Sequence, residues 1–354
     1  MNADVIVIGA GIVGAACAHE LVQAGLNVLV LDARFGSATN ADCALSPCGT
    51  LWLASCDAEM ATAEQKSVRL QDHGVGCELL NAAALAAAKP ALRTGLAGAL
   101  KFGSDSVVYA PCAARWLLTQ SLHSVTFEAG EVTRTRGVRV QLSDGSCRSA
   151  GAVVLATGIK AKRLCPELPL RPKKGHLAIT CRYPGTVHHQ LVELGHINSA
   201  HHGEGTSVAF NVQPRSTGQL LIGSTRQFDT TDPAIEAPLL PPLLRCALNY
   251  LPGLADLNII RTWTYFRAAK PDSLPIIGCL PKRDGLWLAV GHEGLGVTPA
   301  PATAHLLAAQ FTGATLPFNA DFFSPRRFQE VPKCHGIWPR SVSQPTFRRF
   351  SRHH

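Results

Sequence analysis

Short runs of apolar residues, separated by helix-like segments, occur in the first and last parts of the chain. Four of these runs are continuously apolar: Val5–Ile8, Val28–Leu31, Ala152–Ala156 and Leu286–Val290. Such runs are typical of parallel strands that are buried on both faces. The segment between the first two runs has the pattern of a helix that ends near Ala24, where Gly25 can provide the cap. We therefore predict an α/β fold with a parallel, doubly wound sheet.

Residues 172–264 have a different pattern. Strand-like segments recur there between turns rich in glycine and proline, at His176–Thr180, Ser207–Val212 and Gln219–Ser224. One helical segment, Pro238–Tyr250, follows them. This pattern predicts a mostly antiparallel sheet inserted into the first domain, so that the architecture is α+β overall.

Further helix and turn signals lie between these regions. Val138, Val140 and Leu142 alternate with polar residues, and Asp144-Gly145 marks a hairpin turn after them. Gly36–Thr50 is rich in small residues and predicts a loop and a helix start. Further helices are expected at Ala58–His73 after a capping Asp57, at Leu79–Pro90, from about Pro111 to Leu122 and at Pro299–Thr312.

Three glycines follow the first strand in the pattern G-x-G-x-x-G, at Gly9, Gly11 and Gly14. The first allows a sharp turn, the second leaves room for a pyrophosphate, and the third lets helix and strand pack closely. The second strand ends at Asp32, where a carboxylate can bind a ribose hydroxyl. The pattern predicts a Rossmann-type adenine dinucleotide site, and the alternative is a glycine-rich βαβ unit without a ligand. The motif alone does not separate FAD from NAD.

The composition allows two domains or one large α/β domain, with 354 residues of which 46% are hydrophobic and 16% charged. No apolar stretch reaches the length of a membrane helix, and the first strand begins too early for a charged leader, so we expect a cytoplasmic protein. The twelve cysteines are scattered without metal-like spacing. The closest group, Cys43, Cys48 and Cys56, is interpreted as reduced thiols.

The net charge of +8 is concentrated at the end of the chain. Residues 331–354 contain no acid and five basic residues, and removing those five charges leaves +3: Lys333, Arg340, Arg348, Arg349 and Arg352. No basic helix occurs elsewhere, so nucleic-acid binding is not expected. The tail has no apolar periodicity and predicts disorder; it could bind an acidic partner or a membrane surface, or be an unselected extension.

Four motifs occur in a fixed order: G-A-G-I-V-G at Gly9–Gly14, V-V-L-A-T-G at Val153–Gly158, F-R-A-A-K-P-D-S-L-P-I-I-G at Phe266–Gly278 and G-H-E-G-L-G at Gly291–Gly296. Over residues 4–325 the chain thereby resembles the D-amino-acid oxidase-like (DAO) superfamily of FAD-dependent oxidoreductases, which includes glycine oxidase and D-amino-acid dehydrogenase. The run at residues 189–224 is most similar to the flavin-bearing β subunits of opine and D-hydroxyproline dehydrogenases.

The resemblance implies a Rossmann-type FAD-binding domain with an inserted, mostly antiparallel substrate-binding domain. The FAD-binding domain would comprise residues 1–75, 98–171 and 265–330, the substrate-binding domain residues 76–97 and 172–264, and the tail residues 331–354. The residues expected to contact FAD are Gly9, Gly11, Ile12, Val13, Gly14, Asp32, Ala33, Ser46, Val132, Ala156, Thr157, Gly158, Gly291, His292, Gly294, Leu295, Gly296 and Val297.

The loop Gly291–Gly296 favours FAD over NAD on chemical grounds. It leads into a predicted helix, whose positive N-terminal end would face the pyrimidine edge of the flavin. Reduction leaves negative charge at that edge, which a helix N-terminus stabilises, and nicotinamide would not require this. For His292 we expect flavin and substrate contact; the alternative is a loop histidine with a backbone hydrogen bond.

Arg267 is the candidate catalytic and substrate-binding residue. Its guanidinium can bind a carboxylate through two parallel hydrogen bonds, and the resemblance places it over the flavin. The alternatives are a salt bridge to Asp272 or a surface arginine. Phe266 and Ala268 replace the leucine and proline that usually flank this arginine. Tyr265 could line the pocket or belong to the core.

Some members of the superfamily attach the flavin covalently, through a cysteine before the T-P-D-like segment or a histidine in the loop after the acid. This chain has Phe266 in the first region and Asn40 and Asp42 in the second, and Cys279 lies after the motif. We therefore expect non-covalent FAD. A polar segment near the expected pocket entrance has no metal-like spacing and predicts no metal: Glu193, His196, His201, His202 and Glu204.

The predicted reaction is oxidation of the C–N bond of a small amino or imino acid, of the D-amino acid, D-hydroxyproline or opine type, by hydride transfer to flavin N5. We favour a dehydrogenase whose electrons pass to a quinone or to an iron–sulfur or second flavoprotein subunit. Such an enzyme could also be peripheral at the inner membrane. The alternatives are an oxygen-using amine or glycine-type oxidase and a non-catalytic FAD-binding subunit of a larger complex.

Overall fold

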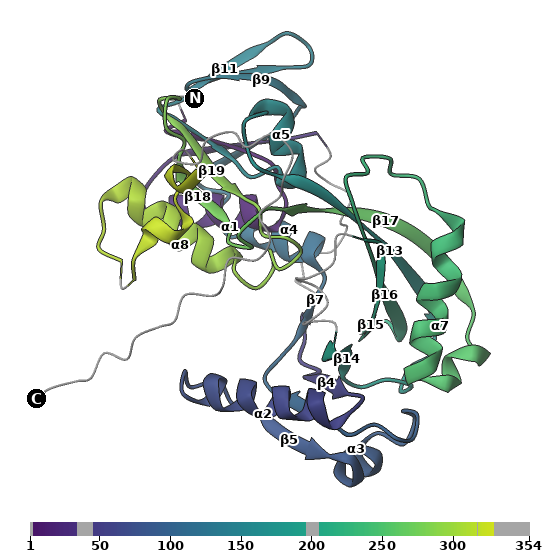
Figure 1. Cartoon of the computed structure of the whole chain (residues 1–354). Coiled ribbons are helices and arrows are strands. Elements are labelled where there is room, and N and C mark those ends of the chain that lie inside the picture. Colours follow the sequence, from purple (N-terminus) through teal and green to yellow (C-terminus); the bar gives the residue numbers. More distant parts are fainter. Residues whose placement is uncertain (1–2, 34–44, 196–204, 317, 329–354) are drawn as a thin grey trace, which may run out of the picture.

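The computed structural model describes residues 3–33, 45–195, 205–316 and 318–328, which form two large sheets with helices packed against them (Figure 1). The predictions for Asn40, Asp42, Cys43, the loop 196–204 and the tail 331–354 concern residues outside this part of the chain.

The first sheet has six strands in the order β18-β19-β12-β1-β2-β8. All are parallel except β18, which runs antiparallel to β19. Their bounds are β1 Val5–Ile8, β2 Val28–Asp32, β8 Val125–Ala129, β12 Ala152–Leu155, β18 Ile276–Cys279 and β19 Leu286–Val290. Every residue of β1 and β12 is buried. The parallel sheet predicted from the apolar runs is confirmed.

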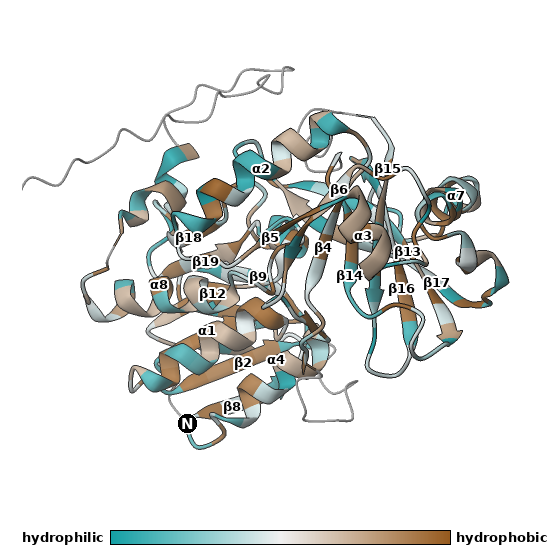
Figure 2. Ribbon diagram, turned by 90° about the horizontal axis from the view of Figure 1, so that it is seen from below, coloured by the Kyte–Doolittle hydropathy of each residue, from teal (hydrophilic) through white to brown (hydrophobic). Residues whose placement is uncertain are grey.

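One face of this sheet is covered by three helices, α1 (Ile12–Gln23), α4 (Ala110–Thr119) and α8 (Ala300–Thr312). In Figure 2 the three helices lie beside strands β2 and β8, which are brown over most of their length. Helix α1 ends as predicted, because Gly25 has a φ of 86° and its N–H donates to the Val22 carbonyl at 2.9 Å.

The opposite face packs against a small antiparallel sheet and the short helix α5 (Ala161–Leu164). The small sheet contains β9 (Val132–Arg136), β10 (Arg139–Leu142) and β11 (Cys147–Ser149). The predicted hairpin at Asp144-Gly145 joins β10 to β11.

The second large sheet has eight strands in the order β17-β13-β16-β15-β14-β4-β6-β5, antiparallel except for the β14–β4 pair. Their bounds are β4 Thr50–Ala54, β5 Glu78–Asn81, β6 Gly98–Phe102, β13 Arg171–Arg182, β14 Gln190–Glu193, β15 Ser207–Pro214, β16 Gln219–Phe228 and β17 Ile259–Ala269. Helix α7 (Leu240–Tyr250) covers β15 and β16, and α2 (Asp57–Gln71) and α3 (Ala82–Ala88) lie at the other end (Figure 1). The predicted mixed architecture is confirmed.

Two local predictions were wrong. The expected helix Leu79–Pro90 is strand β5 followed by the shorter helix α3, because the Asn81 side chain accepts a hydrogen bond from the Ala84 N–H at 2.9 Å and starts the helix there. Asp57 is the first residue of α2 and not its cap, which is Cys56.

Strands β4 and β6 also differ from the expected arrangement. The sequence assigned both segments to the FAD-binding domain, but their hydrogen bonds place them in the eight-stranded sheet. The division into domains stays a prediction, with these two strands moved to its second part.

The remaining elements are short. They are the two-stranded sheet β3 (Leu45–Ser46) with β7 (Val107–Val108), and the 3₁₀ turns η1 Gly158–Lys160, η2 Ala237–Leu239, η3 Pro252–Asp256, η4 Ala320–Phe323 and η5 Pro325–Phe328. Within the described part of the chain, no helix has both the length and the apolar character needed to span a bilayer.

Candidate active site

A cavity of about 610 Å³ opens at the carboxyl ends of β1, β2, β12 and β19 and extends to β17 of the second sheet. Ligands of doubly wound sheets bind at this edge. Most residues predicted to contact a cofactor line it: Gly9, Gly11, Ile12, Val13, Asp32, Ala33, Val132, Ala156, Thr157, Gly158, Gly291, His292, Gly294, Gly296 and Val297. Three do not: Gly14, Ser46 and Leu295.

The glycine turn forms one end of the cavity. A Cβ on Gly9 would lie 2.7 Å from the Ala156 carbonyl oxygen, so only glycine fits there. A Cβ on Gly11 would meet nothing within 4 Å, so the space beside this backbone is open. A Cβ on Gly14 would collide with the Gly9 carbonyl, so Gly14 acts through packing. Asp32 lines the same end and accepts a hydrogen bond from the Ala10 N–H at 2.7 Å.

The middle of the cavity is lined by the end of β12 and the turn after it. The Thr157 hydroxyl is buried and has no hydrogen-bond partner. Lys160 and Arg163 line the cavity nearby and supply positive charge that suits a pyrophosphate. Sequence reasoning missed these two basic residues. Their spacing of three after the strand-ending Thr157-Gly158 places them on one helical face and could have identified them.

The loop Gly291–Gly296 closes the other end. A Cβ on Gly296 would lie 3.6 Å from a methyl group of Val13, so the loop approaches the start of α1. A Cβ on Gly294 would lie 3.0 Å from Cδ of Arg267, so this glycine gives the arginine its space. The loop therefore joins the glycine turn to the second sheet.

His292 of this loop is held by helix α8. Its Nε2 lies 2.9 Å from the Thr303 hydroxyl in the first turn of the helix. Burial, and then the charge of Lys270, lower the pKa of His292 to about 4. The imidazole is therefore neutral at neutral pH, and its hydrogen bond is to a side chain and not to the backbone.

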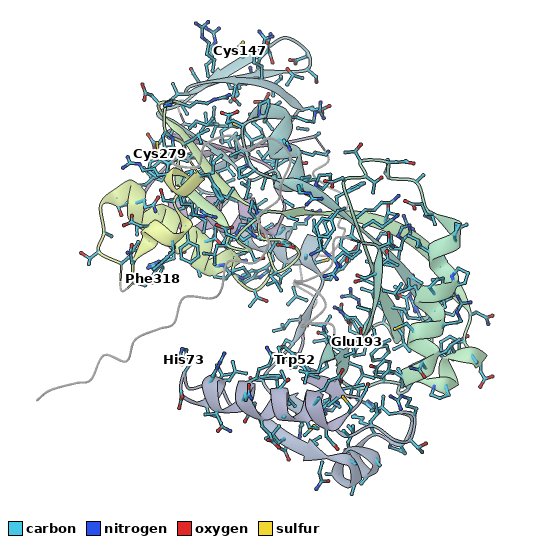
Figure 3. All side chains as sticks on the ribbon, in the orientation of Figure 1. Trp52, His73, Cys147, Glu193, Cys279 and Phe318 are labelled. Atoms are coloured by element: carbon cyan, nitrogen blue, oxygen red, sulfur yellow. The ribbon has the colours of Figure 1, made fainter. Side chains whose placement is uncertain are left out.

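We expect this histidine to make stability depend on pH. Its pKa falls from 6.5 to about 4 on folding, so its contribution is present above pH 6.5 and is lost as the pH falls toward 4, by at most about 3 kcal/mol. Chemical unfolding of His292→Asn between pH 7.5 and 5 should show a shallower loss than the wild type. His73→Asn, which changes an exposed histidine beyond α2 (Figure 3), is the control and should keep the wild-type slope. Equal slopes for all three proteins would contradict this assignment.

Arg267 extends from β17 into the cavity beside the loop. Its Nη2 donates to the Ser224 hydroxyl at 3.0 Å, and its guanidinium carbon lies 4.6 Å from the centre of the Tyr265 ring. Burial, and then the nearby Arg226, lower the pKa of Arg267 to about 10, so it stays charged at neutral pH. Asp272 binds Arg327 at 2.6 Å, so the alternative salt bridge to Asp272 is not observed.

Tyr265 lines the cavity next to Arg267. Its ring lies across Gly175 of the neighbouring strand, where a Cβ would come within 2.7 Å of the ring. Gly175 therefore makes room for the ring, which supports the guanidinium from one side. The tyrosine is half-buried and belongs to the wall of the cavity.

Glu293 also lines the cavity, and sequence reasoning did not single it out although it lies within the G-H-E-G-L-G motif. Its carboxylate accepts a hydrogen bond from Lys173 Nζ at 2.6 Å and lies 3.7 Å from Lys270 Nζ. Both lysines are buried, and Lys270 Nζ has no hydrogen-bond partner. One carboxylate therefore stands between two buried ammonium groups.

The described residues contain no group of three or more histidine, cysteine, aspartate or glutamate side chains that could hold a metal ion. Glu193, labelled in Figure 3, lies on β14 outside the cavity. Cys279 is exposed on β18 and is also not part of the cavity lining (Figure 3).

A family model described as "FAD dependent oxidoreductase" (DAO) matches residues 4–42 and 34–310. Glycine oxidase of Pseudomonas aeruginosa is 31% identical over 241 residues, which cover 64% of this chain and 62% of that protein. One of the subunits of an opine oxidase of Rhizobium meliloti is 24% identical over 92% of this chain and 97% of its own length. The first curated relatives are matched over less than two thirds of their length.

The crystal structure of L-proline dehydrogenase from P. horikoshii resembles this fold, with a TM-score of 0.79 and 22% identity over 93% of this chain and 98% of that one. This likeness concerns the fold alone. It agrees with the arrangement of a parallel sheet beside a large antiparallel one.

Proposed function

Because this chain belongs to the DAO family of FAD-dependent oxidoreductases and uses FAD as its cofactor, we propose that it oxidises the C–N bond of a small amino or imino acid. The observation that carries this proposal is Arg267. Its charged guanidinium lines the cavity beside the loop Gly291–Gly296 and is held by Ser224 and Tyr265. A guanidinium in this position suits a substrate carboxylate.

The cavity fits FAD. The open space at Gly11, the orphaned Thr157 hydroxyl and the basic residues Lys160 and Arg163 suit a pyrophosphate, and Asp32 lies at the end of β2, where a ribose hydroxyl binds in such folds. FAD, when bound, supplies a flavin ring that accepts a hydride. We propose that it is held without a covalent bond, since the described residues that line the cavity include no cysteine.

Arg267 would bind the substrate carboxylate with both arms of its guanidinium. The hydrogen bond to Ser224 and the ring of Tyr265 fix its position before the substrate arrives, so less conformational freedom is lost on binding. Binding through the carboxylate orients the α-carbon and leaves the amine as the other reacting group.

The substrate amine must be neutral for its lone pair to assist the loss of hydride. His292 has a low pKa and faces Thr303 in the structure, so we assign it no role as a base. The positive charges of Arg267 and Lys173 would instead disfavour a bound ammonium and lower the pKa of the amine. Positioning and electrostatics therefore carry the proposed mechanism.

We further propose that the enzyme is a dehydrogenase whose electrons pass to a partner protein or a quinone. The opine oxidase relative, which aligns with 92% of this chain, is named as one of several subunits, and this supports an assembly of more than one chain. The similarity to glycine oxidase favours a second candidate, an oxidase that passes electrons to oxygen.

Anaerobic reduction followed by exposure to air separates these candidates. We expect D-proline or D-hydroxyproline to bleach the visible flavin absorbance of the purified protein. The bleached protein should reoxidise slowly in air and quickly with an artificial quinone. Rapid reoxidation in air with one peroxide formed per flavin would contradict the dehydrogenase. A protein that no amino or imino acid bleaches would support a non-catalytic FAD-binding role.

A further inference from the structure

Three adjacent strands of the second sheet direct basic side chains to one face beside the cavity. Lys173 on β13 pairs with Arg267 on β17 and with Phe228 on β16. Arg226 precedes Phe228 by two residues on β16, so its side chain lies on the same face. The positive charge of Arg226 is one of the causes that lower the pKa of Arg267, which places the two guanidinium groups near each other.

Glu293 is the carboxylate that faces this basic group. Among the described residues, it is the one acid whose charge acts on both Arg267 and Arg226. It also binds Lys173 at 2.6 Å and lies 3.7 Å from Lys270. Its backbone has a φ of 49°, which is rare for a residue other than glycine. Such a conformation is kept where surrounding contacts fix it, commonly at a functional site.

The charges of these residues do not balance. Arg267, Lys173 and Lys270 carry three positive charges against the single negative charge of Glu293, which leaves two positive charges before Arg226 is counted. Both lysines are less than 7% exposed, and buried cations without anionic partners are costly. A substrate with one carboxylate would neutralise one of these charges. A second anionic group is needed for the other.

On the basis of the proposed function, we propose that the substrate is a short dicarboxylic amino or imino acid, and that Arg226 and Lys173 hold its second carboxylate while Arg267 holds the first. Neighbouring strands are about 4.8 Å apart, and Arg267 and Arg226 come from the strands on either side of Lys173. This separation suits two carboxylates joined by a few atoms. Arg226 and Lys173 are then the residues that determine specificity.

Binding of unreactive acids tests the second carboxylate site without any turnover. Glutarate and valerate have the same chain length and differ in one carboxylate. We expect the FAD-loaded protein to bind glutarate at least tenfold more tightly than valerate in a thermal-shift titration. In Arg226→Gln this preference should fall to about one, and Arg226→Lys should restore part of it. Arg261→Gln, which changes an exposed arginine on β17, should keep the wild-type preference.

Equal affinity of the wild type for glutarate and valerate would overturn the proposal, whether or not the variants fold. A glutarate preference that survives in folded Arg226→Gln would overturn the role of Arg226.

Flavin bleaching by matched substrates separates this inference from the proposed function. We expect D-glutamate to reduce the flavin with at least tenfold higher kcat/KM than D-glutamine, and iminodiacetate with at least tenfold higher kcat/KM than sarcosine. Equal rates within each pair would overturn the dicarboxylate proposal and leave amino-acid oxidation intact. Tight glutarate binding without bleaching by any of the four compounds would support the anion site and contradict the oxidation.

Discussion

Arg267→Met should lower kcat/KM for amino-acid oxidation about 10²- to 10³-fold while the protein keeps its FAD. The substitution leaves the apolar bulk of the side chain and removes the guanidinium that faces the cavity. Loss of one partner of a buried, hydrogen-bonded charge pair costs about 2–5 kcal/mol, which corresponds to a loss of this size. Stopped-flow reduction of the flavin under anaerobic conditions measures it.

Two further variants sharpen this test. Arg267→Lys keeps the charge but loses the second arm, so it should recover part of the rate. Arg261→Met, on the same strand and exposed, should behave as the wild type. Wild-type kinetics in a flavin-loaded Arg267→Met protein would show that the substrate carboxylate binds elsewhere.

Gly14→Ala and Gly11→Ala should impair the protein in different ways. A Cβ at Gly14 meets the Gly9 carbonyl and approaches the Ala156 side chain to 3.2 Å, so α1 must move away from β1. We expect Gly14→Ala to destabilise the FAD-free protein by about 1–3 kcal/mol, as overpacking does, and to abolish FAD retention. A Cβ at Gly11 has open space on the protein side, so the FAD-free stability of Gly11→Ala should change by less than about 0.5 kcal/mol.

Gly11→Ala should nevertheless bind FAD weakly, because the added methyl group occupies the space left for the pyrophosphate. Chemical unfolding of the FAD-free proteins and titration with FAD give the two quantities separately. FAD affinity equal to the wild type in Gly11→Ala would mean that the pyrophosphate does not lie at this turn.

The parallel sheet was predictable because its signal is local. Each of its central strands is a continuous apolar run, since both faces are covered, and the glycines after β1 have steric roles that depend on near neighbours. The start of α3 was missed because Asn81 can occupy the body of a helix or its cap, and here the hydrogen bond to Ala84 decides for the cap. Strands β4 and β6 were placed in the wrong sheet because pairing partners far apart in sequence leave no local signal.

The candidate site shows the same division. The motifs identified the cavity-lining glycines and Arg267, because each belongs to a recognisable local pattern. The basic group around Glu293 was not foreseen. Lys173 and Arg226 lie outside all four motifs, and only strand register brings them to one face with Arg267. Charged residues within strands are typical of a solvent-exposed edge until the register is known.

Anaerobic bleaching by carboxylic acids and their decarboxylated amines tests the central claim most directly. Each amino or imino acid is paired with the amine that lacks only its carboxylate, as D-proline is with pyrrolidine. We expect at least one acid to bleach the flavin of the wild type, and its decarboxylated partner to do so at least a hundredfold more slowly, because only the acid can bind Arg267. Bleaching by no acid, or by acid and amine at equal rates, would contradict the account.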